Sequence, residues 1–359
     1  MTELRLASSA EQAVAPQADD STEASDIALG KRFFNYRTFI SFAVGFGIIY
    51  LLLRNVRMDV GATLATIARA DVWLYLVGFL VYYSGFVVRG WRWQRMLSNA
   101  HRDEGEDLPT PSVGRLAQII YVSWFANCLI PAKLGDVVRG YMLKQDAKVR
   151  FMKGMGTIFA ERILDLGVLL VLLTVSGFIS MRDKLPDDVS RALELGFALV
   201  AIAGLGLLCM RHLDELVQRV LPERFRERYA RFHEGTLRSF RNLPFILGLT
   251  FLTWSLEAGR LVFVTWSLGL RLSDDLGTEV LMLAFIALAS AALTALPVTP
   301  GGLGLVEALI VKAFAWSAAA SGVAIANEVV WSVAILDRSI SYGSLVVFGL
   351  MVYLVSRRR

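Results

Sequence analysis

Two short stretches of this chain combine proline, glycine and charged residues within apolar sequence. The first runs from Asn127 to Arg139 and contains Pro131, Gly135 and Asp136. Proline removes a backbone hydrogen-bond donor and glycine loosens a helix, so an apolar helix cannot pass through this stretch intact. The charged side chains follow Gly135 within about one turn, which predicts that a new helix begins there.

The second stretch repeats this pattern later in the chain. Its proline, glycine and acidic residues are Pro297, Pro300, Gly301, Gly302, Gly304 and Glu307. A broken backbone at membrane depth is tolerated only where protein covers it or where it lines a water-filled cavity. We therefore predict that the two stretches face each other and line a common cavity.

The predicted helix starts could bind a phosphate group. The first turn of a helix has unpaired N–H groups and about half a positive charge, so it attracts anions. Arg139 could hold a lipid phosphate through two hydrogen bonds, or it could be an interface arginine that reaches the headgroups. Asp136 could gate transport or only cap its helix. Glu307 suits a first helical turn and could instead take up a proton during transport.

Charged residues also lie inside predicted membrane-spanning segments. They form three groups, Glu161, Arg162 and Asp165, then Glu257 and Arg260, then Asp337 and Arg338. Ionisable residues within a span are candidates for function, although they nearly always pair with one another. For the acid–arginine pairs at 161–162 and 337–338 we favour a structural role that fixes helix packing. All of these residues except Glu257 remain candidates for substrate binding.

The composition places these features in a membrane. Of the 359 residues, 55% are hydrophobic, and the mean hydropathy is +0.52. Soluble domains contain about 45–50% apolar residues, and the excess here falls in blocks near the ~20 residues that cross a bilayer. We predict an all-α polytopic membrane protein, a helical bundle with two re-entrant helical hairpins that are broken by proline and glycine.

The apolar blocks predict an order of elements. Spanning helices are expected near residues 39–53, 72–88, 156–179, 193–210, 245–268 and 329–355, and re-entrant hairpins near 116–143 and 280–320. The arginine and tryptophan residues after Val88 are typical of an interface belt, and the other Trp and Tyr residues suit belts or packing. Residues 1–30 are expected to be a disordered acidic tail, and residues 31–359 a single transmembrane domain.

Positive charge predicts the topology. Eight arginines lie between Arg211 and Arg241, which favours a cytoplasmic location for this link. The link is either an amphipathic helix on anionic headgroups or a solvated basic loop. We therefore expect the protein in the cytoplasmic, or inner, membrane with both termini in the cytoplasm.

The order of elements also suggests an internal repeat. A span with an arginine, a broken hairpin and a span with an acid–arginine pair occur in residues 72–180 and again in about 244–355. Arg89 and Arg260 are the corresponding arginines. The first copy begins with a span that runs inward and the second with one that runs outward, which predicts an inverted-topology repeat of the kind found in secondary transporters.

Three blocks resemble the lysylphosphatidylglycerol synthase transmembrane family, the flippase-like domain of multiple-peptide-resistance proteins. They are Asn127-x-x-x-Pro131-x-x-x-Gly135-Asp136-x-x-Arg139, Glu161-Arg162-x-x-Asp165 and Pro297-x-x-Pro300-Gly301-Gly302-x-Gly304-x-x-Glu307. The resemblance covers roughly residues 35–355. The family usually has glutamate where this chain has Asp136, which keeps the charge but shortens its reach. No aminoacyl-transferase domain follows, so the resemblance does not imply lysyl-lipid synthesis.

The resemblance implies that an anionic phospholipid or a lipid-linked headgroup is moved between leaflets by a protein that is not an enzyme. Its partners would be membrane lipids, and we expect no nucleic-acid partner, no cofactor and no metal ion, while a homo-oligomer is left open. One alternative is a membrane enzyme or accessory protein in the metabolism of polyprenyl-linked sugars or cell-envelope lipids. Another is a scaffold that anchors a partner through residues 211–241.

Overall fold

The computed structural model describes residues 36–55, 59–101, 110–129, 134–181, 187–212, 214–295 and 298–356. Within these ranges the chain is almost entirely helical, and they contain no strand. The predicted acidic tail (1–30), Pro131 and Pro297 lie outside the described residues.

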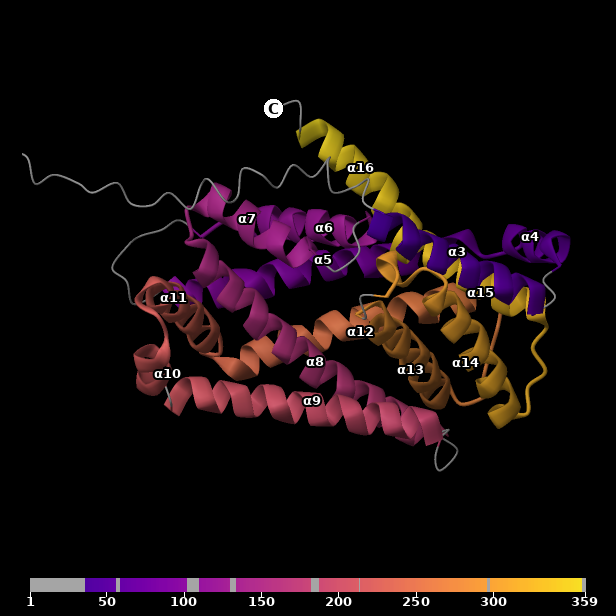
Figure 1. The fold of residues 1–359 in the computed structure, drawn as a ribbon. Coiled ribbons are helices and arrows are strands. Elements are labelled where there is room, and N and C mark those ends of the chain that lie inside the picture. The colour runs from indigo at the N-terminus through magenta and orange to yellow at the C-terminus, as the bar shows by residue number, and fades with distance from the viewer. Residues whose placement is uncertain are drawn as a thin grey trace, which may run out of the picture.

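The helices follow one another along the chain and are labelled in Figure 1. Their bounds are α3 (Tyr36–Asn55), α4 (Val60–Ala68), α5 (Val72–His101), α6 (Val113–Leu129), α7 (Gly135–Ala147), α8 (Phe151–Met181), α9 (Asp187–His212), α10 (Asp214–Val220), α11 (Glu223–Ser239), α12 (Leu243–Ser267), α13 (Leu276–Thr294), α14 (Leu305–Ser321), α15 (Asn327–Arg338) and α16 (Ser344–Ser356).

Seven of the described helical segments are long and apolar enough to cross a membrane. They are Val72–His101, Phe151–Ser180, Asp187–His212, Leu243–Ser267, Leu276–Thr294, Pro300–Ala318 and Asn327–Val352. This confirms the predicted fold class, an all-α polytopic membrane protein. The first predicted span falls on α3, a helix of 20 residues whose described apolar run is Phe42–Leu51, and it stays a prediction.

Helix α5 is longer than predicted, since it continues past Val88 to His101. The arginines that follow residue 88 were interpreted as an interface belt, and for two of them that interpretation is wrong. Arg89 and Arg92 are only 4% and 0% exposed, and both pair with carboxylates on other helices. Paired charges can be buried inside a bundle, so they do not force the helix to end at an interface.

Two helices form the centre of the bundle. Helix α5 packs along α12, where an added Cβ on Gly78 would lie 3.2 Å from Phe263 Cβ, so glycine permits the close approach. Helix α8 crosses this pair and also packs against α7, α9, α11 and α13 (Figure 1). Helix α9 lies on the outside, where 17 of its 26 residues are exposed and only Leu193 is buried, as expected for a helix that faces lipid.

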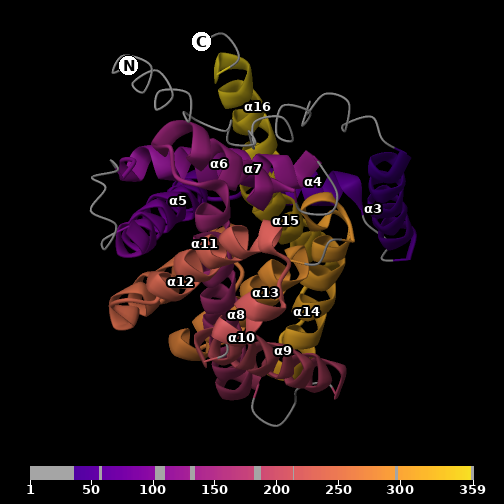
Figure 2. The ribbon, with the colours of Figure 1, turned by 60° about the vertical axis from the view of Figure 1, so that its left-hand side comes forward.

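The arginine-rich link contains an amphipathic helix, α11, rather than a solvated loop. Gly235, Thr236 and Ser239 are buried where α11 packs on α8, and Figure 2 shows the two helices together. An added Cβ on Gly156 of α8 would lie 2.3 Å from Phe232 O, so the two backbones touch. The link is therefore docked on the protein through one face.

Each broken stretch lies between two helices. That either pair is a re-entrant hairpin stays a prediction, and in the second pair Leu276–Thr294 and Pro300–Ala318 are each long enough to cross a membrane. Helices α6 and α7 pack against each other, as do α13 and α14. Helix α13 begins at Asp275, and hydrogen bonds from Thr278 lower the pKa of Asp275 below its usual value, so this cap is ionised at neutral pH. A π-helical turn, Ser339–Gly343, joins α15 to α16, and such turns are frequent at functional sites.

Candidate functional site

A cavity of about 420 Å³ lies where the two broken stretches meet. Its walls include Asn127, Cys128 and Asp136 from the first stretch, and Thr299, Gly301 and Val306 from the second. The two stretches therefore lie together in the fold, as their shared pattern suggested. The volume falls within the ~300–1,000 Å³ that is typical of sites for small ligands.

The first break is held closed by a hydrogen bond across it. The Asn127 Oδ1 atom accepts a hydrogen bond from the Gly135 backbone N–H at 2.9 Å, which ties the end of α6 to the first residue of α7. An added Cβ on Gly135 would lie 2.2 Å from the carbonyl oxygen of Ser123. Only glycine lets the two helices approach this closely, so this position is fixed by packing.

The second break depends on three glycines with positive φ. Gly301, Gly302 and Gly304 have φ values of +57°, +72° and +82°, a region that favours glycine. An added Cβ on Gly301 would lie 2.6 Å from the Tyr342 ring and 3.3 Å from the Cys128 Sγ atom. The backbone of the second break thus lies against α6 from the first hairpin and against the π-helical turn.

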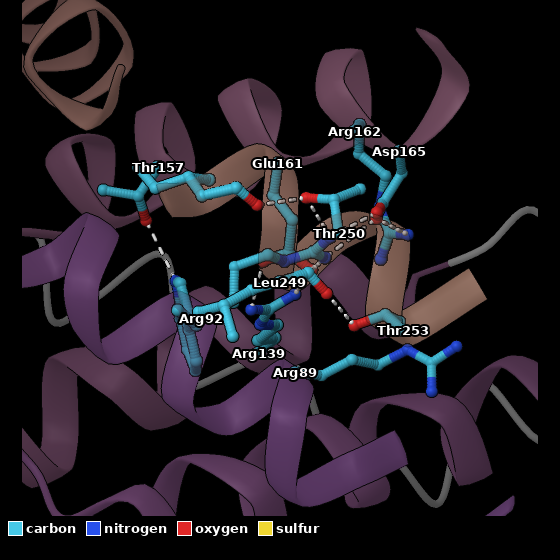
Figure 3. Close-up of polar contacts among 12 residues, drawn as sticks. Arg89, Arg92, Arg139, Thr157, Glu161, Arg162, Asp165, Leu249, Thr250 and Thr253 are labelled. Carbon is cyan, nitrogen blue, oxygen red and sulfur yellow. Dashed lines mark hydrogen bonds and ion pairs between the residues drawn. The ribbon is translucent and has the colours of Figure 1, made fainter. Parts of the chain in front are cut away.

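One group of buried charges lies among α5, α7 and α8 (Figure 3). Arg92 on α5 is fully buried and donates hydrogen bonds to Glu161 at 2.9 Å and to Asp165 at 2.5 and 3.1 Å. Arg139 on α7 donates two more to Glu161, at 2.6 and 3.1 Å, and its guanidinium group lies 3.7 Å from the centre of the Trp93 ring. These contacts lock α5, α7 and α8 together.

A different pair from the same helices forms part of the cavity wall. Arg162 on α8 donates hydrogen bonds to both carboxylate oxygens of Asp136 on α7, at 3.0 and 2.7 Å. Their side chains are 41% and 26% exposed. Asp165, also in the wall, lies 3.9 Å from Arg162. Asp136 is not the N-cap of α7, which is Leu134, so its side chain serves this ion pair.

A second buried group joins α5, α12 and α15. Arg89 donates a hydrogen bond to Glu257 at 3.0 Å, and Glu257 lies 3.4 Å from Arg260 one turn along α12. Arg260 lies 3.3 Å from Asp337. Glu257, Arg260 and Asp337 line the cavity, although each is less than 10% exposed.

Arg338 binds the second break directly. Its Nε donates to Glu307 at 2.8 Å, and its Nη2 donates to the Gly301 carbonyl oxygen at 2.9 Å. The other Glu307 oxygen accepts a hydrogen bond from the Gly304 N–H at 2.7 Å. The guanidinium group also lies 4.9 Å from the centre of the Tyr342 ring. Glu307 thus serves the first turn of α14 and, at the same time, anchors Arg338.

Aromatic side chains complete the wall. They are Tyr82, Trp124, Trp254 and Tyr342. Among the residues that the structure describes, the Trp254 Nε1 and Thr299 Oγ1 atoms are buried at the cavity without a hydrogen-bond partner. Such groups carry a free-energy cost unless water or a ligand pairs with them. The wall therefore offers charged, polar and aromatic surface to a bound molecule.

The predicted site residues divide into two sets. Asn127, Asp136, Arg162, Asp165, Arg260, Gly301, Asp337 and Arg338 line the cavity. Gly135, Arg139, Glu161, Pro300, Gly302, Gly304 and Glu307 are not among its lining residues. The placement of Arg139 differs most from expectation, because this side chain is 1% exposed and contacts Glu161 and Trp93. It neither faces a lipid phosphate nor reaches an interface.

Sequence reasoning missed several residues of the site. Arg92 pairs with both carboxylates of the first buried group, Glu161 and Asp165. The pair of Arg89 and Glu257 joins α5 to α12. The aromatic wall was also missed, since Trp and Tyr were interpreted as belts or packing. The useful signal was the pair of arginines one turn apart on α5, which can be buried inside a bundle only when carboxylates face them.

Comparison with known proteins agrees with the architecture. A family model described as the lysylphosphatidylglycerol synthase TM region matches residues 38–349. The chain belongs to this family. Within it, the chain is 35% identical over 244 residues to a UPF0104 membrane protein of Methanocaldococcus jannaschii, a match that covers 65% of this chain and 95% of that protein.

Two further relatives extend the comparison. A UPF0104 membrane protein of Pyrococcus horikoshii is 23% identical over 332 residues, covering 82% of this chain and 91% of its own length. Glycosyltransferase AglD of Haloferax volcanii is 27% identical over 297 residues, covering 72% of this chain but 46% of AglD. The matched region is thus less than half of AglD.

Proposed function

We propose that this member of the lysylphosphatidylglycerol synthase TM region family is a lipid transporter. Its substrate would be an anionic phospholipid or a lipid-linked sugar, whose headgroup crosses through the cavity while its tails stay in the bilayer. In this proposal the protein translocates lipid and performs no covalent chemistry. We place it in the cytoplasmic membrane with both termini in the cytoplasm, as the arginine-rich link favours.

One observation carries the proposal. Two proline- and glycine-broken stretches, far apart in sequence, meet around a cavity that contains charged and aromatic side chains. In a bilayer the charges of a lipid headgroup are costly to move, and a polar chamber within the protein lowers that cost. Broken helices at the binding site are a recurring feature of secondary transporters.

The first helix pair suits a re-entrant hairpin, whereas α13 and the segment Pro300–Ala318 are each long enough to cross the membrane. Helices α6 and α7 are 17 and 13 residues long, too short to span a bilayer singly, and they turn back at the first break. In each half, the acid near the start of the post-break helix pairs with an arginine on the next helix along the chain, Asp136 with Arg162 and Glu307 with Arg338. We interpret this correspondence as the inverted repeat, with Arg92 rather than Arg89 as the counterpart of Arg260.

A cavity-filling variant tests the proposal without removing any charge. Ala291 lines the cavity on α13, so Ala291→Trp should fill it and stop the movement of fluorescent phospholipid between leaflets of proteoliposomes. The matched control is Leu199→Trp on the exposed face of α9, which should transport like wild type. If both variants keep wild-type transport while the folded protein is recovered, the cavity is not the path.

A second candidate is an enzyme that acts on lipid-linked sugars. It is favoured by the similarity to a protein named glycosyltransferase AglD. Incubation of the purified protein with a polyprenyl phosphate and a nucleotide sugar tests it directly. A glycosylated lipid product that is absent from an Arg162→Gln sample would favour the enzyme over the transporter.

A further inference from the structure

We propose that Asp136 occupies the place of the substrate's phosphate on Arg162, and that a phosphate ester entering the cavity displaces it. The inference rests on the proposed transport of a lipid headgroup through this cavity. It assigns the anion-binding group to Arg162 and gives Asp136 the role of an internal competitor. The two pairs of acid and arginine near the breaks differ in ways that point to this one.

The pair at the second break, Arg338 and Glu307, is largely buried and held by further hydrogen bonds to the backbone. Arg338 and Glu307 are 10% and 14% exposed, and each makes a further hydrogen bond, to the Gly301 carbonyl oxygen and from the Gly304 N–H. Displacing Glu307 would therefore also disturb the backbone of the second break. An anion in the cavity has little access to Arg338, whose hydrogen bonds to Glu307 and Gly301 it would have to replace.

The pair at the first break is open by comparison. Arg162 is 41% exposed and Asp136 26% exposed, and both lie in the cavity wall. Their two hydrogen bonds are the bidentate contact that a guanidinium group makes equally well with a carboxylate or a phosphate. A phosphate in the cavity can thus approach Arg162 and replace Asp136 with the same geometry.

The other charges of α8 do not depend on this pair. Arg92 and Arg139 hold Glu161, and Arg92 holds Asp165 through two hydrogen bonds. Asp165 lies 3.9 Å from Arg162, beyond hydrogen-bond distance. When Asp136 leaves, Arg162 keeps the 3.9 Å ion pair with Asp165 but loses both of its hydrogen bonds to a carboxylate, and the buried contacts between α5, α7 and α8 stay intact.

The exchange would connect binding to a movement of the first hairpin. Asp136 lies in the first turn of α7, directly after the break that Gly135 closes, and its ion pair ties this turn to α8. A phosphate on Arg162 keeps the arginine neutralised but releases the start of α7. Lipid phosphates and free phosphate esters share the recognised chemistry, so the test includes both.

Binding of short-chain dihexanoyl phosphatidylglycerol to the purified full-length protein, measured by calorimetry in a neutral detergent, tests the exchange. Removing the competitor with Asp136→Asn should tighten binding about tenfold, because Arg162 is then free before the ligand arrives. Arg162→Gln should abolish binding in both the wild-type and Asp136→Asn backgrounds. Arg162→Lys keeps the charge but loses the planar guanidinium group that makes two parallel hydrogen bonds, so this variant should bind the lipid weakly.

The chain provides a matched control. Arg115 and Asp146 form an ion pair with side chains 41% and 23% exposed, close to the values at Arg162 and Asp136, but they do not line the cavity. Asp146→Asn therefore frees an equally exposed arginine elsewhere and should leave binding unchanged. Dihexanoylglycerol, which has no phosphate, should not bind, and glycerol phosphate should bind more weakly than the lipid if the substrate is a lipid.

Three results would overturn the exchange. They are unchanged or weaker binding by Asp136→Asn, wild-type binding by both Arg162 variants, and an equal gain from Asp146→Asn. Equal affinity for glycerol phosphate and the lipid would keep Arg162 as the phosphate site but assign it to free phosphate esters. If the exchange fails while Ala291→Trp still stops transport, the transport proposal stands without it.

Discussion

At the scale of single residues, the buried arginines are not equivalent. Arg92 and Arg139 are buried, pair with Glu161 and are not among the residues that line the cavity, whereas Arg162 is in its wall. We therefore propose that substrate binding and structural pairing, which the sequence left as alternatives for these groups, fall on different arginines of the same cluster. The distinction predicts different outcomes for the same kind of substitution.

Arg92→Gln should destabilise the protein strongly. It leaves Glu161 short of one partner and Asp165 without its two hydrogen bonds at 2.5 and 3.1 Å, in a site where the arginine is fully buried. Breaking a buried pair on one side costs about 3–5 kcal/mol. Thermal unfolding in detergent, followed by circular dichroism, should show a clear drop in Tm.

The comparison for this prediction is Arg115→Gln, which breaks an exposed pair worth at most ~1 kcal/mol. Its Tm should stay near that of wild type. Equal Tm values for the two variants would mean that Arg92 does not hold α5 and α8 together as its contacts indicate.

At the scale of elements, sequence patterns predicted that helices stop and start again at the two broken stretches, because proline and glycine act locally on the backbone. They failed at the end of α5. The hydropathy signal ended at Val88, since a sequence cannot show that Arg89 and Arg92 meet carboxylates more than 60 residues away. For the same reason the sequence could not separate Arg139 from Arg162, whose roles depend on which helix each one faces.

Gly135→Ala tests the tight contact inside the first hairpin. The added Cβ would lie 2.2 Å from the Ser123 carbonyl oxygen, so α6 and α7 must move apart at a cost of about 1–3 kcal/mol. Gly206→Ala on α9, where nothing lies within 4 Å, is the control and should be neutral or slightly stabilising. The measurement is Tm together with transport, and both should fall only for Gly135→Ala.

A double-mutant cycle tests the contact between α5 and α12. Arg89→Gln and Glu257→Gln should each destabilise, because each leaves a buried charge at the 3.0 Å pair without its partner. The double variant should recover part of the loss, with a coupling of about 0.5–3 kcal/mol. Strictly additive changes in unfolding free energy would show that the pair does not couple the two helices.

At the scale of the whole molecule, the charges around the cavity balance. The described cluster contains six arginines, Arg89, Arg92, Arg139, Arg162, Arg260 and Arg338. It also contains six carboxylates, Asp136, Glu161, Asp165, Glu257, Glu307 and Asp337. A neutral cluster can stay inside a membrane without an anion, which is why an entering phosphate must displace a carboxylate rather than fill an empty site.

The central proposal is that the two broken stretches together line the chamber through which lipid headgroups pass. Native Cys128 lines the cavity from the first stretch and Thr299 from the second, so Thr299→Cys in a Cys209→Ser background places a thiol on each stretch. A short bis-methanethiosulfonate reagent should bridge them within one chain. We predict that the bridge stops phospholipid transport in proteoliposomes and that a reductant restores it. Failure of the bridge to form in folded protein, or transport that continues unchanged across a complete bridge, would contradict this account.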